Sequence, residues 1–297
     1  MSARAISPAL AFGIAAIGIG LFSIMDAFMK ALVLSLGVYN ALFWRTMIGA
    51  GFGAVAWQAG GGGAPSLRAF KLHLARGSVT AVMATLFFWG LGRVPMAQAI
   101  TLTYIAPILA LLLGAIILHE RVGRRVVFAS VAAFGGVLVL LAGQSRMELG
   151  PEAFEGAVAI LVSAVLYAVN LVIARVQSQA ARPGEIAFFQ STIVTLLLAC
   201  AAPWFLVVPD AAAWPMLVIG AALGSGSLLL LAFAYAHADT GFLATTEYTS
   251  FLYAAVLGFA VFGERVSLFT ILGAALIVAA CLYAARRPVI GPIEASA

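Results

Sequence analysis

The sequence has little charge and few side chains of the kinds that bind metals. Only 9% of its 297 residues are charged, whereas an ordinary soluble domain has about 25%. It has three histidines and two cysteines, and Cys200 and Cys281 lie in separate apolar runs, so we expect neither a disulfide nor a metal site. No Walker, H-E-x-x-H or paired-aspartate motif is present. The sequence therefore predicts no enzyme, no cofactor and no metal.

Hydrophobic residues dominate the chain, at 64% of its length. Runs of roughly 20 apolar residues, enough to cross about 30 Å of hydrocarbon, recur from end to end. The run from Ser7 to Met29 is too long for a secretory signal and has no A-x-A site after it. We predict an all-α membrane protein with ten transmembrane helices, over residues 8–29, 38–58, 72–91, 96–118, 123–142, 154–174, 185–207, 213–236, 241–262 and 266–285.

The net charge of +5 comes from basic residues in the short loops between these spans, not from one solvated basic face. We therefore expect no nucleic acid partner. With a cytoplasmic N-terminus, the inner loops and span ends hold most of the basic residues: Arg4, Arg68, Lys71, Arg76, Arg121, Arg124, Arg125, Arg175, Arg182, Arg286 and Arg287. The outer ones hold Lys30, Arg93, Arg146 and Arg265. This bias predicts that both termini are cytoplasmic.

The two halves of the sequence match when one is shifted by 144 positions. The shift places Tyr104 on Tyr248, with a Glu-Arg pair at the same distance after each, and Asp26 on Asn170. We predict two five-helix repeats, over residues 8–142 and 154–286. Because five is odd, the second repeat must insert upside down, and inverted repeats of this kind are a recurrent design of transporters.

Three ionisable side chains lie within the predicted spans: Asp26, Arg45 and Glu247. A charge in hydrocarbon is costly, so such residues usually face a cavity or a partner. Asp26 and Arg45 lie at similar depth on neighbouring antiparallel spans and are able to pair. The alternative is that Asp26 pairs with Lys30, four residues on along the same helix. Both readings stay open.

The repeat predicts two polar layers that line the mouths of one pathway and take part in gating. The outer layer is Asp26, Arg45, Thr103 and Tyr104; the inner layer is Asn170, Gln190, Glu247 and Tyr248. Aromatic candidates for the pathway are Trp44, Trp89, Tyr104, Tyr167, Phe188 and Tyr248, although aromatic residues in membrane helices more often serve packing. Pro107 predicts a kink, and because its repeat partner is Phe251, the kink is expected in the first repeat only.

These motifs resemble the drug/metabolite transporter superfamily, and within it the members built from EamA domains. The resemblance rests on Phe43-Trp44-Arg45, Tyr104-Ile-Ala-Pro107, His119-Glu120-Arg121, Glu247-Tyr248-Thr249 and Phe262-Gly263-Glu264. The pattern is similar to the branch with S-adenosylmethionine uptake carriers, with riboflavin carriers and amino-acid exporters as alternatives. The resemblance implies alternating access without ATP in a bacterial inner membrane.

We therefore predict a secondary transporter for a small organic metabolite, amino-acid-like or S-adenosylmethionine-like. A buried arginine with nearby acids suits a solute with both a carboxylate and an amine. The alternatives are an exporter of amino acids or drugs with the same fold, and a membrane scaffold or sensor that transports nothing. The expected partners are the small-molecule substrate and the lipid bilayer, and a homodimer is one of the arrangements that the sequence leaves open.

Overall fold

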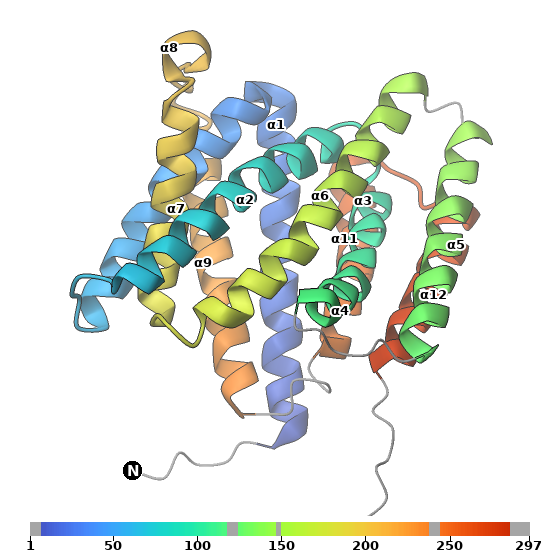
Figure 1. Ribbon diagram of the computed structural model, residues 1–297. Helices are drawn as coiled ribbons and strands as arrows, with labels where there is room; N and C mark the ends of the chain where they lie inside the picture. The colour runs from blue at the N-terminus through green and yellow to red at the C-terminus, as the bar shows by residue number, and fades with distance from the viewer. Residues whose placement is uncertain (1–6, 118–123, 147–149, 238–243, 286–297) are drawn as a thin grey trace, which may run out of the picture.

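The computed structural model describes residues 7–117, 124–146, 150–237 and 244–285, and every regular element in these ranges is helical (Figure 1). The elements are α1 (Pro8–Ala59), α2 (Leu67–Leu91), α3 (Met96–Thr103), α4 (Ile105–Ile117), α5 (Arg124–Arg146), α6 (Gly150–Gln177), α7 (Pro183–Ala199), α8 (Ala202–Phe205), α9 (Trp214–His237), the 3₁₀ helix η1 (Ala244–Tyr248), α11 (Thr249–Phe262) and α12 (Leu268–Ala285).

The first two predicted spans are joined directly in α1. The helix breaks only at Gly37, where φ is 76° and ψ is 160°. A residue with a Cβ is strained at this φ, whereas glycine adopts it readily. We call residues 8–36 the first arm of α1 and residues 38–59 its second arm. Figure 1 shows the chain turning back at the end opposite the N-terminus, after which the second arm runs obliquely away from the first and along α7.

Two predicted spans are interrupted near their middle or start. Residues 96–117 form α3 and α4, which are separated at Tyr104, three residues before Pro107. Proline has no N–H to donate to the carbonyl four residues earlier, so the helix is weakened there. In the second repeat, the 3₁₀ helix η1 passes into α11 after Tyr248, the repeat partner of Tyr104, and the backbone of Tyr248 stays helical. The helical hydrogen-bonding pattern therefore changes at equivalent positions of the two repeats.

The predicted uninterrupted span over residues 185–207 is wrong. α7 ends at Ala199, and the short α8 follows from Ala202. Pro203 accounts for this end, because its ring would clash with the carbonyl of Ala199 in a continuous helix.

Four of the described helices are long and apolar enough to cross a bilayer: Ala9–Ala59, Leu67–Leu91, Pro151–Ala174 and Trp214–Leu231. Other apolar helices are shorter. Several helices also turn large apolar side chains outward, and α5 exposes Phe128, Val131, Phe134 and Leu138 at helical spacing. A continuous apolar stripe of this kind suits contact with lipid.

Helices of the first repeat pack mainly against helices of the second. α1 contacts α9 and α7, α2 contacts α6, and α5 contacts α12. A shift of 144 residues maps α2 onto α9 and the first arm of α1 onto α6, so the α2–α6 pair and the α1–α9 pair are repeat equivalents. The packing therefore follows the sequence repeat.

Candidate functional site

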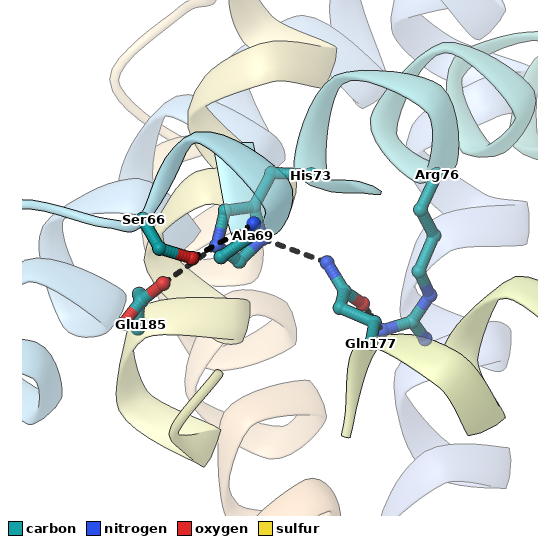
Figure 2. A network of polar contacts seen from close by, with 6 residues as sticks. All are labelled: Ser66, Ala69, His73, Arg76, Gln177 and Glu185. Atoms are coloured by element: carbon teal, nitrogen blue, oxygen red, sulfur yellow. Dashed lines mark hydrogen bonds and ion pairs between the residues drawn. The ribbon is translucent and has the colours of Figure 1, made fainter. Parts of the chain in front are cut away.

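A network of polar side chains joins α2 to α6 and α7 (Figure 2). His73 lies between Glu185 and Gln177: its Nε2 is 2.8 Å from Glu185 Oε1 and its Nδ1 is 2.7 Å from Gln177 Nε2. Arg76 donates from Nη1 to Gln177 Oε1 at 2.8 Å and from Nε to Asn170 Oδ1 at 2.7 Å. His73 and Gln177 have no exposed surface.

Arg76 fixes which atoms donate and which accept in the rest of this network. Arginine has only donors, so Gln177 must turn its carbonyl oxygen toward Arg76 and its NH₂ toward His73. The His73 ring then accepts at Nδ1 and donates from Nε2 to Glu185. A buried polar network of this kind stabilises the fold when its members find partners.

Two predicted pathway residues of the inner layer belong to this network. Asn170 donates to Thr80 Oγ1 at 3.0 Å, and Gln190 donates to the same oxygen at 3.1 Å. Asn170 and Gln190 therefore connect the two repeats through Thr80. A third candidate, Tyr167, lies on α6, three residues before Asn170.

Sequence reasoning missed four members of the network: His73, Arg76, Gln177 and Glu185. His73 stands at a predicted span end, and Arg76 contributes there only to the charge bias. A pattern that could have revealed them is the spacing of His73, Arg76 and Thr80, which places three polar side chains on one face of α2. Their partners on α6 and α7 have no such marker.

A second polar cluster lies at the opposite end of the bundle and ties Lys30 to Glu264. These residues form an ion pair, and Lys30 Nζ also donates to the carbonyl of Val94 at 2.6 Å. The second oxygen of Glu264 accepts from the backbone N–H of Met96 at 2.7 Å, at the N-terminus of α3, where a negative charge is favoured. The buried lysine is therefore paired with Glu264, and the alternative in which Asp26 pairs with Lys30 is wrong.

Asp26 and Arg45 lie in the interior between the two repeats. The Asp26 side chain is buried, at 2% exposure, and its Oδ1 has no hydrogen-bond partner among the described residues. Arg45 Nε is also buried without a partner there. The guanidinium lies over Phe88, 5.7 Å from the ring centroid, and its Nη1 would be 3.9 Å from a Cβ on Gly224 of α9.

Met25, next to Asp26, and Arg45 both lie against Gly224, but Asp26 and Arg45 form no direct ion pair in the described chain. Other buried side-chain atoms without a partner in that part are Gln98 Nε2, Thr192 Oγ1 and Ser227 Oγ. Unsatisfied buried polar atoms are uncommon in folded proteins, so each one needs an explanation.

The predicted outer and inner layers meet at Tyr104 and Tyr248. Their ring centroids are 5.4 Å apart and their planes are nearly perpendicular, at 84°. The Tyr104 hydroxyl is 2.7 Å from Ser250 Oγ and 3.4 Å from the backbone carbonyl of Glu247. The two tyrosines therefore do not stand at opposite mouths, as the layers predict, but touch where the interrupted helices cross.

Of the other candidates, Trp44 contacts residues far along the chain, whereas Trp89 and Thr103 contact residues within four positions. Trp44 donates from Nε1 to the carbonyl of Val207 at 2.9 Å and packs edge-on against Trp214. Trp89 stacks under the guanidinium of Arg93, whose carbon lies 3.7 Å from the ring centroid. Thr103 donates to the carbonyl of Ile100 within its own helix. Among the residues that the structure describes, no group of three or more His, Cys, Asp or Glu side chains could hold a metal ion.

Several known proteins that resemble this chain in sequence are transporters. The chain is 28% identical over 270 residues to the pseudopaline exporter CntI of Pseudomonas aeruginosa, covering 89% of this chain and 92% of the exporter. It is 28% identical to a riboflavin transporter of Rhizobium johnstonii, covering 72% and 70% of the two chains. It is 24% identical to an S-adenosylmethionine uptake transporter of Rickettsia prowazekii, covering 71% and 70%. Exporters and uptake transporters are both represented.

The fold is shared with a protein of known crystal structure. The TM-score is 0.62 at 20% identity, and the match covers 94% of this chain and 97% of the other. The model of the EamA-like transporter family matches the chain twice, over residues 9–142 and 154–286. Proteins of this family are multi-pass membrane proteins with an internal repeat, within the drug/metabolite transporter superfamily. The chain belongs to the EamA-like transporter family.

Proposed function

We propose that this protein is a secondary transporter that moves a small organic metabolite across the bacterial inner membrane by alternating access. The observation that carries the proposal is the contact between Tyr104 and Tyr248. These repeat partners lie where the hydrogen-bonding pattern of equivalent helices changes, and carriers of inverted-repeat design bind their solutes at irregular helices on the repeat interface. The solute is amino-acid-like or S-adenosylmethionine-like.

Ten spans in two inverted repeats, 8–142 and 154–286, are part of this proposal. Hydrogen bonds at the two ends of the bundle support it. Arg182, before α7, donates to the carbonyl of Gly60, after α1, whereas Val207, after α7 and α8, donates to Asn40 near the start of the second arm. The second arm and α7 are repeat equivalents, and they therefore run in opposite directions. The basic loops put both termini in the cytoplasm.

Flux in proteoliposomes tests the proposal. The purified protein is reconstituted, and counterflow is measured for amino acids, S-adenosylmethionine and riboflavin, with protein-free liposomes as the control. We expect saturable counterflow of one solute class without ATP. A membrane scaffold or sensor predicts that no solute moves, and that result would overturn the proposal.

A crosslink across the Lys30–Glu264 cluster tests alternating access separately. Cysteines replace Lys30 and Glu264 in a chain that carries Cys200→Ser and Cys281→Ala, and a short bis-maleimide joins them. We expect the crosslink to stop flux, because it ties the two repeats together at one end. The Lys30→Cys single variant, treated in the same way, is the control and should keep its flux.

A further inference from the structure

Asp26 and Arg45 are opposite charges that share the protein interior without pairing. Asp26 is on the first arm of α1 and Arg45 is on the second arm, so the fold at Gly37 brings them together. Met25, next to Asp26, and Arg45 both lie within 4 Å of the Cβ position of Gly224, yet no ion pair joins Asp26 and Arg45 in the described chain. Asp26 Oδ1 and Arg45 Nε also have no hydrogen-bond partner there.

Two other charged side chains in the interior, those of Lys30 and Arg76, do have partners. Lys30 binds Glu264 and the carbonyl of Val94, and Arg76 binds Asn170 and Gln177. A buried charge without a partner costs several kcal/mol, and a polar residue at this depth usually faces a ligand or a pathway. The neighbouring amine that could have paired with Asp26, that of Lys30, is held by Glu264. The structure therefore leaves one anionic and one cationic group to be satisfied by something else.

The surroundings of Arg45 suit a ligand at the repeat interface. Its guanidinium lies beside Gly224 of α9, where a Cβ would be 3.9 Å from Nη1. Ser227, one turn further along α9, has a completely buried hydroxyl with no partner among the described residues. Phe88 lies beneath the guanidinium. A cation and an anion on α1 and a hydroxyl on α9 are thus left without partners where these two helices pack together.

We propose that Asp26 and Arg45 form a two-point recognition site for a zwitterionic organic molecule. Arg45 binds the carboxylate of the solute, since the guanidinium fork matches the two carboxylate oxygens. Asp26 binds its ammonium group, and Ser227 adds a hydrogen bond on the carboxylate side. This inference rests on the proposed transport function, because it names the solute class that the transporter takes.

The experiment removes one charge from the protein and the matching charge from the solute. The probes are methionine and S-adenosylmethionine, together with N-acetylmethionine, which lacks the ammonium, and methioninamide, which lacks the carboxylate. Counterflow competition is measured for the wild type, Asp26→Asn and Arg45→Gln. Asp210→Asn and Arg68→Gln remove the same charges at exposed positions and serve as controls.

For the wild type and both controls, we expect the zwitterions to compete better than the two singly charged analogues, by roughly tenfold to a hundredfold per missing charge. Asp26→Asn should no longer distinguish methionine from N-acetylmethionine, but should still reject methioninamide. Arg45→Gln should show the opposite pattern. Arg45→Lys keeps the charge without the fork and should fall between the wild type and Arg45→Gln, which keeps the test decisive if Arg45→Gln does not fold.

Two results would overturn the inference while transport itself stands. One is wild-type flux of riboflavin or singly charged solutes with no competition from zwitterions. The other is a wild-type preference for zwitterions that persists in Asp26→Asn and in the Arg45 variants. Absence of wild-type flux for any solute would instead refute the proposed function, so the two failures are distinguishable.

Discussion

The buried polar residues of α2 and those of α1 differ in how their hydrogen-bonding capacity is used. On α2, His73 and Arg76 meet side chains of α6 and α7, and Gln177 uses both its oxygen and its nitrogen. On α1, Asp26 and Arg45 each keep an atom with no partner among the described residues. Both regions join the same two repeats.

Under the proposal above, this difference separates residues that hold the fold from residues that bind the solute. A paired network stabilises the interface between repeats, and losing one member leaves the others buried and unsatisfied. A charge without a partner adds no such stabilisation, so its removal should not lower the free energy of unfolding. Depth in the membrane alone does not distinguish the two cases. Stability measurements on single variants test this difference between α1 and α2.

The largest loss of stability is expected for Arg76→Ala. The substitution leaves Asn170 Oδ1 and Gln177 Oε1 without their charged donor, and each unsatisfied oxygen costs about 1–3 kcal/mol. We expect the free energy of unfolding in detergent to fall by about 3 kcal/mol. Arg68→Ala, at an exposed position on the same helix, is the control and should change it little. An equal effect of both would mean that the network does not stabilise the interface.

Glu264→Gln should have the next largest effect, because it removes the counter-charge of the buried Lys30. We expect a loss of about 2 kcal/mol in thermal or chemical unfolding. Glu152→Gln neutralises an exposed glutamate and is the matched control. If the Glu264 variant is as stable as this control, the Lys30–Glu264 pair does not stabilise the fold.

Gly258→Ala tests the same cluster through its geometry. A Cβ on Gly258 would lie 2.6 Å from Glu264 Oε2, so the carboxylate would have to move away from the N–H of Met96. We expect destabilisation by about 1 kcal/mol. Gly51→Ala is the control, because a Cβ there meets nothing within 4 Å, and alanine in that helix should be neutral or stabilising. Destabilisation by the Gly51 variant alone would contradict this account.

No loss of stability is expected for Asp26→Asn. The variant removes a buried charge that has no ion pair in the described chain, so the free energy of unfolding should stay the same or rise. Differential scanning fluorimetry against Asp210→Asn measures this difference. A loss as large as that of Arg76→Ala would place Asp26 among the structural residues and end the contrast between α1 and α2.

Most of the fold could be predicted from local properties of the sequence. Apolar runs and the 144-residue shift indicate an all-helical membrane protein with an internal repeat, and the fold and family match agree with this. What could not be predicted is where a helix ends or changes type within a run of uniformly hydrophobic residues. Pro203 ends α7 early, and the second repeat passes from a 3₁₀ helix into an α-helix at Tyr248 with no proline to mark it.

The candidate site was less predictable, because polar residues at similar depth have different surroundings. Asn170 and Gln190 both bind Thr80 in the network, whereas Asp26 and Arg45 remain unpaired. Tyr104 and Tyr248 were expected at opposite mouths but lie in contact. Depth along one helix is readable from the chain, but the neighbours on other helices are not.

By itself the sequence determined that the protein is a helical membrane protein with two related halves, because hydrophobicity and spacing are properties of neighbouring residues in the chain. Only the tertiary structure decided which buried charges are paired. Lys30 finds Glu264 across 234 positions of sequence, and Arg76 finds Gln177 across 101. Such pairing depends on distances of a few ångströms between helices, which arise only when the two repeats pack together.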